Sequence, residues 1–287
     1  MSFRVVVVKE RCKLDLKTGF LICRNQEGEK RVFISEISCL IIESTSISLT
    51  TALMCELIKN NVAVILCDEK HNPQSQLLPY YGNYNTYNKI IEQQNWGQEI
   101  KALVWQAIIK QKILKQAQLL KEYGLQVESD MLFDYAKDVQ KNDKTNREGH
   151  AAKVYFNALF GLDFARREIN DINTALNYGY AVLLACFNRE IVKCGYLTQL
   201  GIWHKNEFNL FNLASDLMEP FRPIVDRLVL NLNKEHAYKG QILDMFNLQL
   251  KMHKKNLYLE NAITAYCQSV FEALNNKKIG DIIFYDI

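Results

Sequence analysis

Several familiar catalytic and cofactor motifs are missing from this sequence of 287 residues. There is no glycine-rich G-x-G-x-x-G or G-x-x-x-x-G-K loop, no G-x-S-x-G nucleophile elbow and no H-E-x-x-H zinc helix. A nucleotide hydrolase and a serine hydrolase are therefore disfavoured. Any catalytic chemistry has to come from polar residues that stand inside apolar helices.

Cysteine pairs and long apolar runs are missing as well. The 8 cysteines include no C-x-x-C pair, so a thiolate zinc knuckle is not expected, and most stand in apolar contexts. The longest apolar run, near residues 181–187, is far shorter than the ~20 residues that span a membrane. The first ten residues have only a short apolar run and are not expected to form a signal peptide. We therefore expect a cytoplasmic protein with reduced thiols and no membrane partner.

Charge of one sign is not in excess either. The chain has 35 basic and 32 acidic residues, which gives a net charge of +3, so any cationic surface for a polyanion must be local. The hydrophobic fraction of 48% and the charged fraction of 23% are ordinary for a globular protein. The length suggests roughly two domains.

The first part of the chain has the pattern of a small β-rich domain. Short apolar runs separated by turn signals predict strands at residues 4–8, 14–16, 20–23, 31–34, 39–42 and 62–67. Residues 50–60 change to helical spacing. The following segment, 79–95, is rich in Tyr and Asn and is expected to be a linker. Its tyrosines could stack on bases, or could simply pack on neighbouring residues.

The rest of the chain has helical periodicity. Helices are expected at residues 100–123, 131–139, 149–160, 172–194, 208–218, 224–232, 241–253 and 257–274, followed by an apolar, strand-like tail at 280–287. The predicted fold class is therefore α+β. It comprises a β-rich domain (1–78), a linker (79–95) and a larger all-α domain (96–287). The helix at 100–123 is expected to be amphipathic and carries five lysines, which we interpret as a solvated face.

The most unusual segment of the helical part is 201–227. It contains His204, the acids Asp216 and Glu219, and two prolines in otherwise apolar sequence. Buried carboxylates are costly unless they are paired or bind a cation. Asp216 and Glu219 are spaced to share a helix face, and Pro220 predicts that the helix ends at Glu219. This would place Glu219 at a junction between two helices.

A further acid, Glu148, stands at the start of another predicted helix. Taken alone it could simply complement the helix dipole, and a lone histidine such as His204 is more often hydrogen-bonded than a ligand. Together, Glu148, His204 and Glu219 form a set of two carboxylates and one imidazole. Such a set suits Mg²⁺ or Mn²⁺ better than structural zinc. These ions can activate a nucleophile and stabilise charge in phosphoryl displacement.

At these residues the chain resembles the CRISPR-associated integrase-endonuclease of spacer acquisition, and most closely its type II form. The resemblance covers nearly the whole chain. It rests on four segments that occur in the family's order: SISLTTALMCELIKNNVAVILCD, NREGHAAKVYFNALFG, DINTALNYGY and GIWHKNEFNLFNLASDLMEPFRPIVD.

The resemblance implies a metal-dependent DNA endonuclease and integrase. Glu148, His204 and Glu219 would be the catalytic residues and the ligands of Mg²⁺ or Mn²⁺, with Asp216 as an accessory acid. A DNA 3′-hydroxyl would attack the CRISPR repeat in a transesterification, or water would attack in a hydrolysis.

Partners are implied in the same way. They are double-stranded DNA (the prespacer and the CRISPR repeat), a second copy of the chain bound through the β-rich domain, a small CRISPR-associated partner protein, and further type II acquisition factors. Lys205, Arg166 and Arg167, with the lysines of residues 101–121, become candidate phosphate contacts.

Two other functions remain open from the sequence. The chain could be a non-catalytic DNA-binding scaffold subunit of an acquisition complex, in which the acids serve only structure. It could also be a small-molecule metallohydrolase, although no compact metal-binding motif supports that reading.

Overall fold

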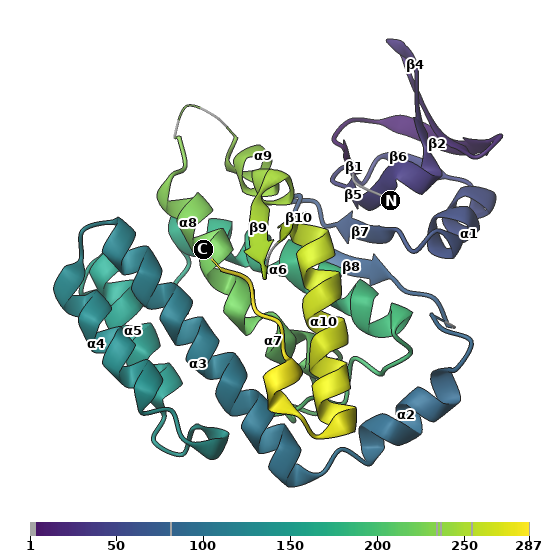
Figure 1. The fold of residues 1–287 in the computed structure, drawn as a ribbon. Coiled ribbons are helices and arrows are strands. Elements are labelled where there is room, and N and C mark those ends of the chain that lie inside the picture. Colours follow the sequence, from purple (N-terminus) through teal and green to yellow (C-terminus); the bar gives the residue numbers. More distant parts are fainter. Residues whose placement is uncertain (1–3, 81, 234, 236, 254, 287) are drawn as a thin grey trace.

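The computed structural model describes residues 4–80, 82–233, 235, 237–253 and 255–286. A β-rich module at the N-terminal end, coloured purple and dark blue in Figure 1, lies beside a larger helical part. None of the helices in the described part is long and apolar enough to cross a membrane. The predicted α+β fold class is confirmed.

The N-terminal module contains two four-stranded sheets. One has the strand order β4-β3-β2-β6, in which only the β2–β6 pair is parallel. The other has the order β1-β5-β7-β8, with β1, β5 and β7 parallel and β8 antiparallel. The bounds are β1 Arg4–Val8, β2 Cys12–Lys17, β3 Phe20–Asn25, β4 Gly28–Phe33, β5 Ile37–Ile42, β6 Ile47–Leu49, α1 Thr51–Lys59, β7 Ala63–Cys67 and β8 Pro73–Leu77.

Strand β5 explains how the two parts of the molecule are joined. All six of its residues are buried, as expected for a strand that is covered on both faces. Leu40 and Ile42 pack in the core of the N-terminal module, whereas Cys39 and Ile41 pack in the core of the helical part. Helix α6 packs against β7 and β8 from the helical side. The sheet is therefore a wall shared by two hydrophobic cores.

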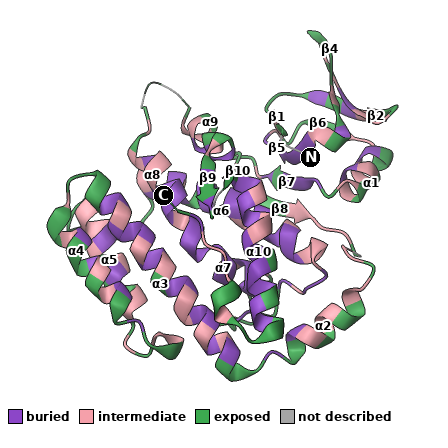
Figure 2. Cartoon of the chain, in the orientation of Figure 1, coloured by how far each residue is buried: buried purple, intermediate pink, exposed green. Residues whose placement is uncertain are grey.

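The helical part is built around α3, which contacts α4, α5, α8 and α10 (Figure 1). Figure 2 shows buried residues along most of this helix. The bounds are α2 Thr86–Gln94, α3 Gln98–Glu122, α4 Gln126–Lys137, α5 Arg147–Phe160, α6 Asp171–Lys193, α7 Asn212–Leu217, α8 Arg222–Leu230, α9 Tyr238–Leu243 and α10 Leu259–Asn276, with strands β9 Gln249–Met252 and β10 Lys255–Tyr258.

The prediction of one helix over 241–253 is wrong. Helix α9 ends at Leu243, and β9 pairs with β10 in an antiparallel hairpin. The burial of β9 alternates, with Leu250 and Met252 buried and their neighbours exposed, which is the period of a strand and not of a helix. The expectation of a strand-like tail at 280–287 is wrong for its described part: Ile279–Asp281 is a 3₁₀ turn, and only Asp286 pairs with Lys251, as an isolated bridge. The tail's last residue, Ile287, lies outside the described residues.

Three shorter elements had no clear sequence signal. Strands β6 and β8 were not predicted; β8, with the sequence PQSQL, is polar because it lies at the edge of its sheet. Residues 86–94 of the expected linker form α2, while Tyr81 of the same segment is not described. The other predicted strands, and the helices other than that at 241–253, are present with shifted ends.

Candidate active site

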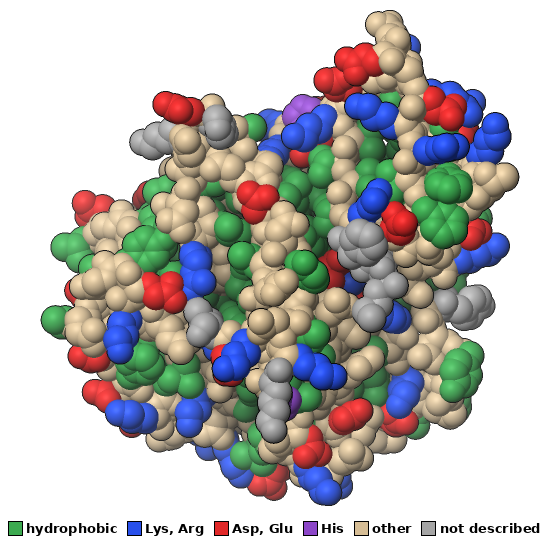
Figure 3. All heavy atoms as spheres, turned by 45° about the horizontal axis from the view of Figure 1, so that its top comes forward, with side chains coloured by type: hydrophobic (Ala, Val, Ile, Leu, Met, Phe, Trp, Pro, Cys, Tyr) green, Lys and Arg blue, Asp and Glu red, His purple; other side chains and the backbone are tan. Residues whose placement is uncertain are grey.

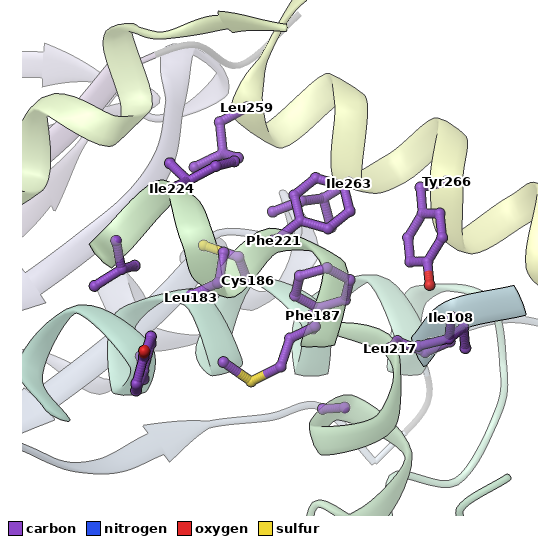
Figure 4. Close-up of a cluster of buried hydrophobic side chains, with 14 of the residues drawn as sticks. Ile108, Leu183, Cys186, Phe187, Leu217, Phe221, Ile224, Leu259, Ile263 and Tyr266 are labelled. Carbon is purple, nitrogen blue, oxygen red and sulfur yellow. The ribbon is translucent and has the colours of Figure 1, made fainter. Parts of the chain in front are cut away.

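Glu219 lies in a sharp junction between two helices, as the sequence predicted. Helix α7 ends at Leu217, a single 3₁₀ turn covers Glu219–Phe221, and α8 starts at Arg222. Pro220 has no backbone N–H for the α7 ladder, so the helix cannot continue through it. The flanking Leu217 and Phe221 are fully buried and are drawn in the apolar cluster of Figure 4. The apolar flanks therefore fix the position of an acid that is itself buried.

Two cations hold the Glu219 carboxylate. Arg222 donates from Nε to Oε1 at 2.8 Å, and the Nζ of Lys112 lies 2.5 Å from Oε2. Burial alone would raise the pKa of Glu219, but Arg222 and Lys112 outweigh it and lower the pKa to about 2. Glu219 is therefore ionised at neutral pH although only 4% of its surface is exposed.

Lys112 also pairs with the second predicted acid, Glu148. Its Nζ donates to Glu148 Oε1 at 2.6 Å. Glu148 stands in the first turn of α5, where Asp143 accepts hydrogen bonds from the backbone N–H groups of Arg147 and Glu148. Burial lowers the pKa of Lys112, but the two carboxylates outweigh it and the pKa is raised. Two acids from distant parts of the chain therefore meet at one ammonium group.

The interpretation of the lysines of α3 as one solvated face is wrong for two of them. Lys110 and Lys121 are exposed, but Lys112 and Lys115 are buried. The helix is enclosed by its neighbours and is not amphipathic. Lys112 stands on the same helix face as Trp105 and Ile108, since residues at intervals of three, four and seven share a face. A lysine within that apolar stripe is the sequence signal from which the burial of Lys112 could have been predicted.

His204 is held by Asp216. The imidazole Nδ1 lies 2.5 Å from Asp216 Oδ1, and the same carboxylate accepts backbone N–H bonds from Ile202, Trp203 and His204 at 2.6, 2.9 and 3.1 Å. Asp216 is fully buried. Because a carboxylate only accepts hydrogen bonds, Nδ1 carries the proton, and Nε2 is the atom left for a ligand. The bond to Asp216 raises the pKa of His204.

The loop that carries His204 is shaped by close packing. Gly201 has no room for a side chain, because a Cβ atom there would lie 2.4 Å from the His204 carbonyl oxygen. Trp105 of α3 stacks on Trp203, with ring centroids 5.7 Å apart, and meets the His204 ring edge-on. The imidazole is therefore fixed by a carboxylate, by the backbone and by an indole.

The three predicted ligands share one neighbourhood but do not form a closed metal cluster. Glu219 and Glu148 both contribute to raising the pKa of His204, after its hydrogen bond to Asp216. Within the described residues no group of three or more His, Cys, Asp or Glu side chains is close enough to hold a metal ion. Lys112 lies between the two glutamates. The donor set of two carboxylates and one imidazole fits a hard divalent ion.

A second buried network connects Arg222 with two tyrosines and Asp226. Its guanidinium lies over the ring of Tyr180, whose hydroxyl donates to Asp226, and Tyr155 donates to the other oxygen of Asp226 at 2.8 Å. Burial raises the pKa of Asp226 to about 6. Neither Arg222 nor Asp226 was predicted as a site residue. Both stand in the segment PFRPIVDR, but the tyrosines that complete the network come from other helices, α5 and α6.

The candidate phosphate contacts differ in their surroundings. Lys205 follows His204 and is exposed, and Arg167 is exposed too. Arg166 donates to Asn177 at 2.9 Å and lies over the rings of Phe156 and Tyr180, so it is already engaged. On the face drawn in Figure 3, basic side chains are interspersed with acidic ones.

Comparisons with known proteins agree on one family. Residues 5–261 match the family model described as CRISPR associated protein Cas1. The chain is 36% identical over 243 residues to the CRISPR-associated endonuclease Cas1 of Neisseria meningitidis serogroup C, strain 8013, and the match covers 84% of this chain and 80% of that protein.

Solved structures share the fold. A casposase bound to integration product superposes with a TM-score of 0.76 at 22% identity, covering 97% of this chain and 92% of that one. A chain of a Cas6-RT-Cas1–Cas2 complex superposes with a TM-score of 0.73 at 17% identity over 97% of this chain, which spans 36% of that longer chain.

Proposed function

Because this chain belongs to the Cas1 family of CRISPR-associated proteins, we propose that it is a metal-dependent DNA endonuclease and integrase that inserts new spacers into a CRISPR array. One observation carries the proposal. Glu148 and Glu219, 71 residues apart, converge on a single cation beside a histidine whose Nε2 remains available. The name of the Neisseria relative supports nuclease activity, and the casposase structure supports DNA integration.

Each residue of the site has a role that follows from its contacts. Glu148, His204 and Glu219 are the proposed ligands of Mg²⁺ or Mn²⁺. When bound, such an ion supplies charge stabilisation for phosphodiester exchange. Asp216 is a positioning residue, because it fixes the tautomer and orientation of the imidazole. Arg222 keeps the Glu219 carboxylate in place and ionised. The buried Trp105 packs edge-on against the His204 ring and so helps to fix its orientation.

The proposed reaction joins two DNA strands. A 3′-hydroxyl oxygen attacks a phosphodiester of the repeat, so that one P–O bond forms, another breaks, and the leaving oxygen takes up a proton. Water in place of the hydroxyl gives hydrolysis. Lys205 and Arg167, both exposed, are the proposed contacts to DNA phosphates, together with Arg166 if its present partners release it.

The remaining proposals concern organisation and partners. We assign residues 1–78 to a dimerisation domain, 79–95 to a connection and 96–287 to the catalytic domain. The Cas1–Cas2 complex among the structural neighbours supports a Cas2 partner. We also propose that the chain assembles as a homodimer and belongs to the type II subtype. It would work with further type II acquisition factors in the prokaryotic cytosol.

The scaffold alternative also has an observation in its favour. Lys112 already neutralises both glutamates, which is what purely structural acids require. The two functions differ in their dependence on metal. A scaffold binds DNA without changing it, whereas an integrase needs Mg²⁺ or Mn²⁺ and all three proposed ligands.

An integration assay separates them. Short duplex DNA, a repeat-containing target, Mn²⁺ and the Cas2 partner would be combined with wild type, Glu148→Gln, His204→Asn or Glu219→Gln. Each substitution removes a proposed ligand, so we expect strand transfer to fall by at least about 10²-fold, the scale seen when a transition-state contact is removed. Gel analysis of joined strands measures the effect.

The exposed Glu207, close to His204 in the sequence, provides a matched control. Glu207→Gln makes the same chemical change without touching a proposed ligand, and it should retain strand transfer. Full activity in all three ligand variants would refute the site, and DNA binding without any metal-dependent product would favour the scaffold.

A further inference from the structure

Lys112 is a buried cation whose only charged partners among the described residues are two acids of the proposed metal site. Its Nζ lies 2.6 Å from Glu148 Oε1 and 2.5 Å from Glu219 Oε2. Its side chain is 10% exposed, so the ammonium is nearly withdrawn from water. The ammonium is therefore the positive charge that lies between these two carboxylates.

Another lysine on the same helix shows that this placement is specific. Lys115 is buried as well, but the described residues bring no carboxylate within ion-pair distance of it. Its ammonium lies 4.5 Å from the centre of the Tyr285 ring instead. Burial of a lysine on α3 therefore does not by itself lead to the glutamates. Lys112 is the one aimed at them.

A divalent ion and this ammonium cannot share the space between the two carboxylates. Like charges a few ångströms apart repel strongly where water is scarce. The lysine stem has four rotatable carbons and a compact charge, so the ammonium can leave without moving the backbone of α3. Without an ion, the same ammonium offsets the repulsion between Glu148 and Glu219.

We propose that Lys112 is a displaceable internal cation, which holds Glu148 and Glu219 together in the metal-free protein and must be expelled when Mg²⁺ or Mn²⁺ binds. The inference rests on the proposed function, because it assumes that these glutamates are ligands. It assigns Lys112 as a positioning residue that tunes metal affinity. A site without the lysine would bind metal more tightly but would be less well ordered before metal arrives.

The test measures metal binding on the full chain without DNA. Free Mn²⁺ is followed by electron paramagnetic resonance as protein is added. Lys112→Met removes the competitor and nearly keeps the shape of the side chain. We expect its Kd for Mn²⁺ to fall by about tenfold, which corresponds to about 1.4 kcal/mol. Lys115→Met, the matched control, should bind Mn²⁺ as wild type does.

Thermal unfolding gives a second readout of the same proposal. Without metal, Lys112→Met should melt below wild type, since two carboxylates lose a shared partner. Saturating Mn²⁺ should raise its melting temperature by more than it raises that of wild type. If Lys112→Met does not fold, Lys112→Arg keeps the charge. Its planar, bidentate group should hold both glutamates more firmly and weaken Mn²⁺ binding relative to wild type.

The failures of the two proposals are distinguishable. If wild type binds Mn²⁺ and Glu219→Gln does not, while Lys112→Met binds no more tightly than wild type, the displacement is refuted and the metal site stands. If wild type and Glu219→Gln are equally unable to bind Mn²⁺, the metal site fails and the role of Lys112 fails with it.

Discussion

Asp216 and Glu219 lie three residues apart, but the fold holds them in opposite ways. Asp216 accepts hydrogen bonds from three backbone N–H groups, which cannot leave while the loop stays folded, and it also pairs with an imidazole. Glu219 is held by side-chain cations, Lys112 and Arg222. The site therefore has two halves. In the permanent half, Asp216 orients His204 through bonds that include the backbone. In the exchangeable half, Glu219 is held by the side chains of Lys112 and Arg222, which another cation could replace.

The largest expected effect tests the permanent half. Asp216→Ala would leave three backbone donors and the imidazole without their acceptor. We expect a loss of about 3 kcal/mol or more in the free energy of unfolding, measured by urea denaturation. Ser215→Ala, a change to the adjacent partly exposed residue of α7, should cost far less.

The comparison also predicts that Glu219→Ala is less costly than Asp216→Ala in metal-free protein. In Glu219→Ala, Lys112 retains its ion pair with Glu148, and Arg222 retains its position over the Tyr180 ring. Equal losses in the two variants would contradict the division into permanent and exchangeable halves.

The second effect is a dependence of stability on pH, in which Glu219 acts at acidic pH and His204 at alkaline pH. The folded pKa of Glu219 is lowered to about 2 from 4.5. Its contribution to the free energy of unfolding is therefore complete above about pH 4.5 and is lost as the pH falls towards 2. A shift of this size corresponds to about 3 kcal/mol. The folded pKa of His204 is raised. Its contribution to the free energy of unfolding is therefore complete below pH 6.5 and is lost as the pH rises through the folded pKa.

Urea denaturation across pH separates these contributions. The stability difference between wild type and Glu219→Gln should shrink between pH 4.5 and 2, and that between wild type and His204→Gln should shrink on the alkaline side. Differences are needed because the pKa of Asp226 is raised to about 6, so Asp226 lowers the free energy of unfolding as the pH rises through that range in every variant. Parallel curves for wild type and Glu219→Gln in acid would be incompatible with an ionised, cation-held Glu219.

The local features of the site were accessible from the sequence. A histidine, two acids and two prolines within one short segment indicated a site, and Pro220 correctly placed Glu219 at a helix junction. These inferences depend on local spacing, which the sequence displays. The same local logic placed Glu148 at a helix start. The hydrogen bond between Asp216 and His204 was not predicted.

The exchangeable half was not accessible in the same way. Lys112 meets Glu148 and Glu219 only because α3 passes through the centre of the helical part, and chain order alone does not reveal that enclosure. The prediction of a helix over 241–253 missed the hairpin β9–β10 for a related reason, since the few alternating residues of the hairpin also fit a helical pattern. Tertiary contacts decided both cases.

The smallest effect concerns what keeps Glu219 aimed at its cations. Tyr285 is fully buried, and its hydroxyl donates to the Pro220 carbonyl oxygen at 2.9 Å. The C-terminal segment thus anchors the backbone of the junction, in addition to the bond from Arg222 to the Glu219 side chain. Tyr285→Phe should cost about 1 kcal/mol in the free energy of unfolding, because a buried carbonyl loses its partner.

Tyr266→Phe is the matched control for that substitution. The Tyr266 hydroxyl is also buried, but it has no hydrogen-bond partner in the described part of the chain. Removing it should therefore be neutral or slightly stabilising, although both substitutions delete one oxygen from the same aromatic core. If the two variants lost equal stability, the Tyr285–Pro220 bond would contribute nothing specific to the helix junction that carries Glu219.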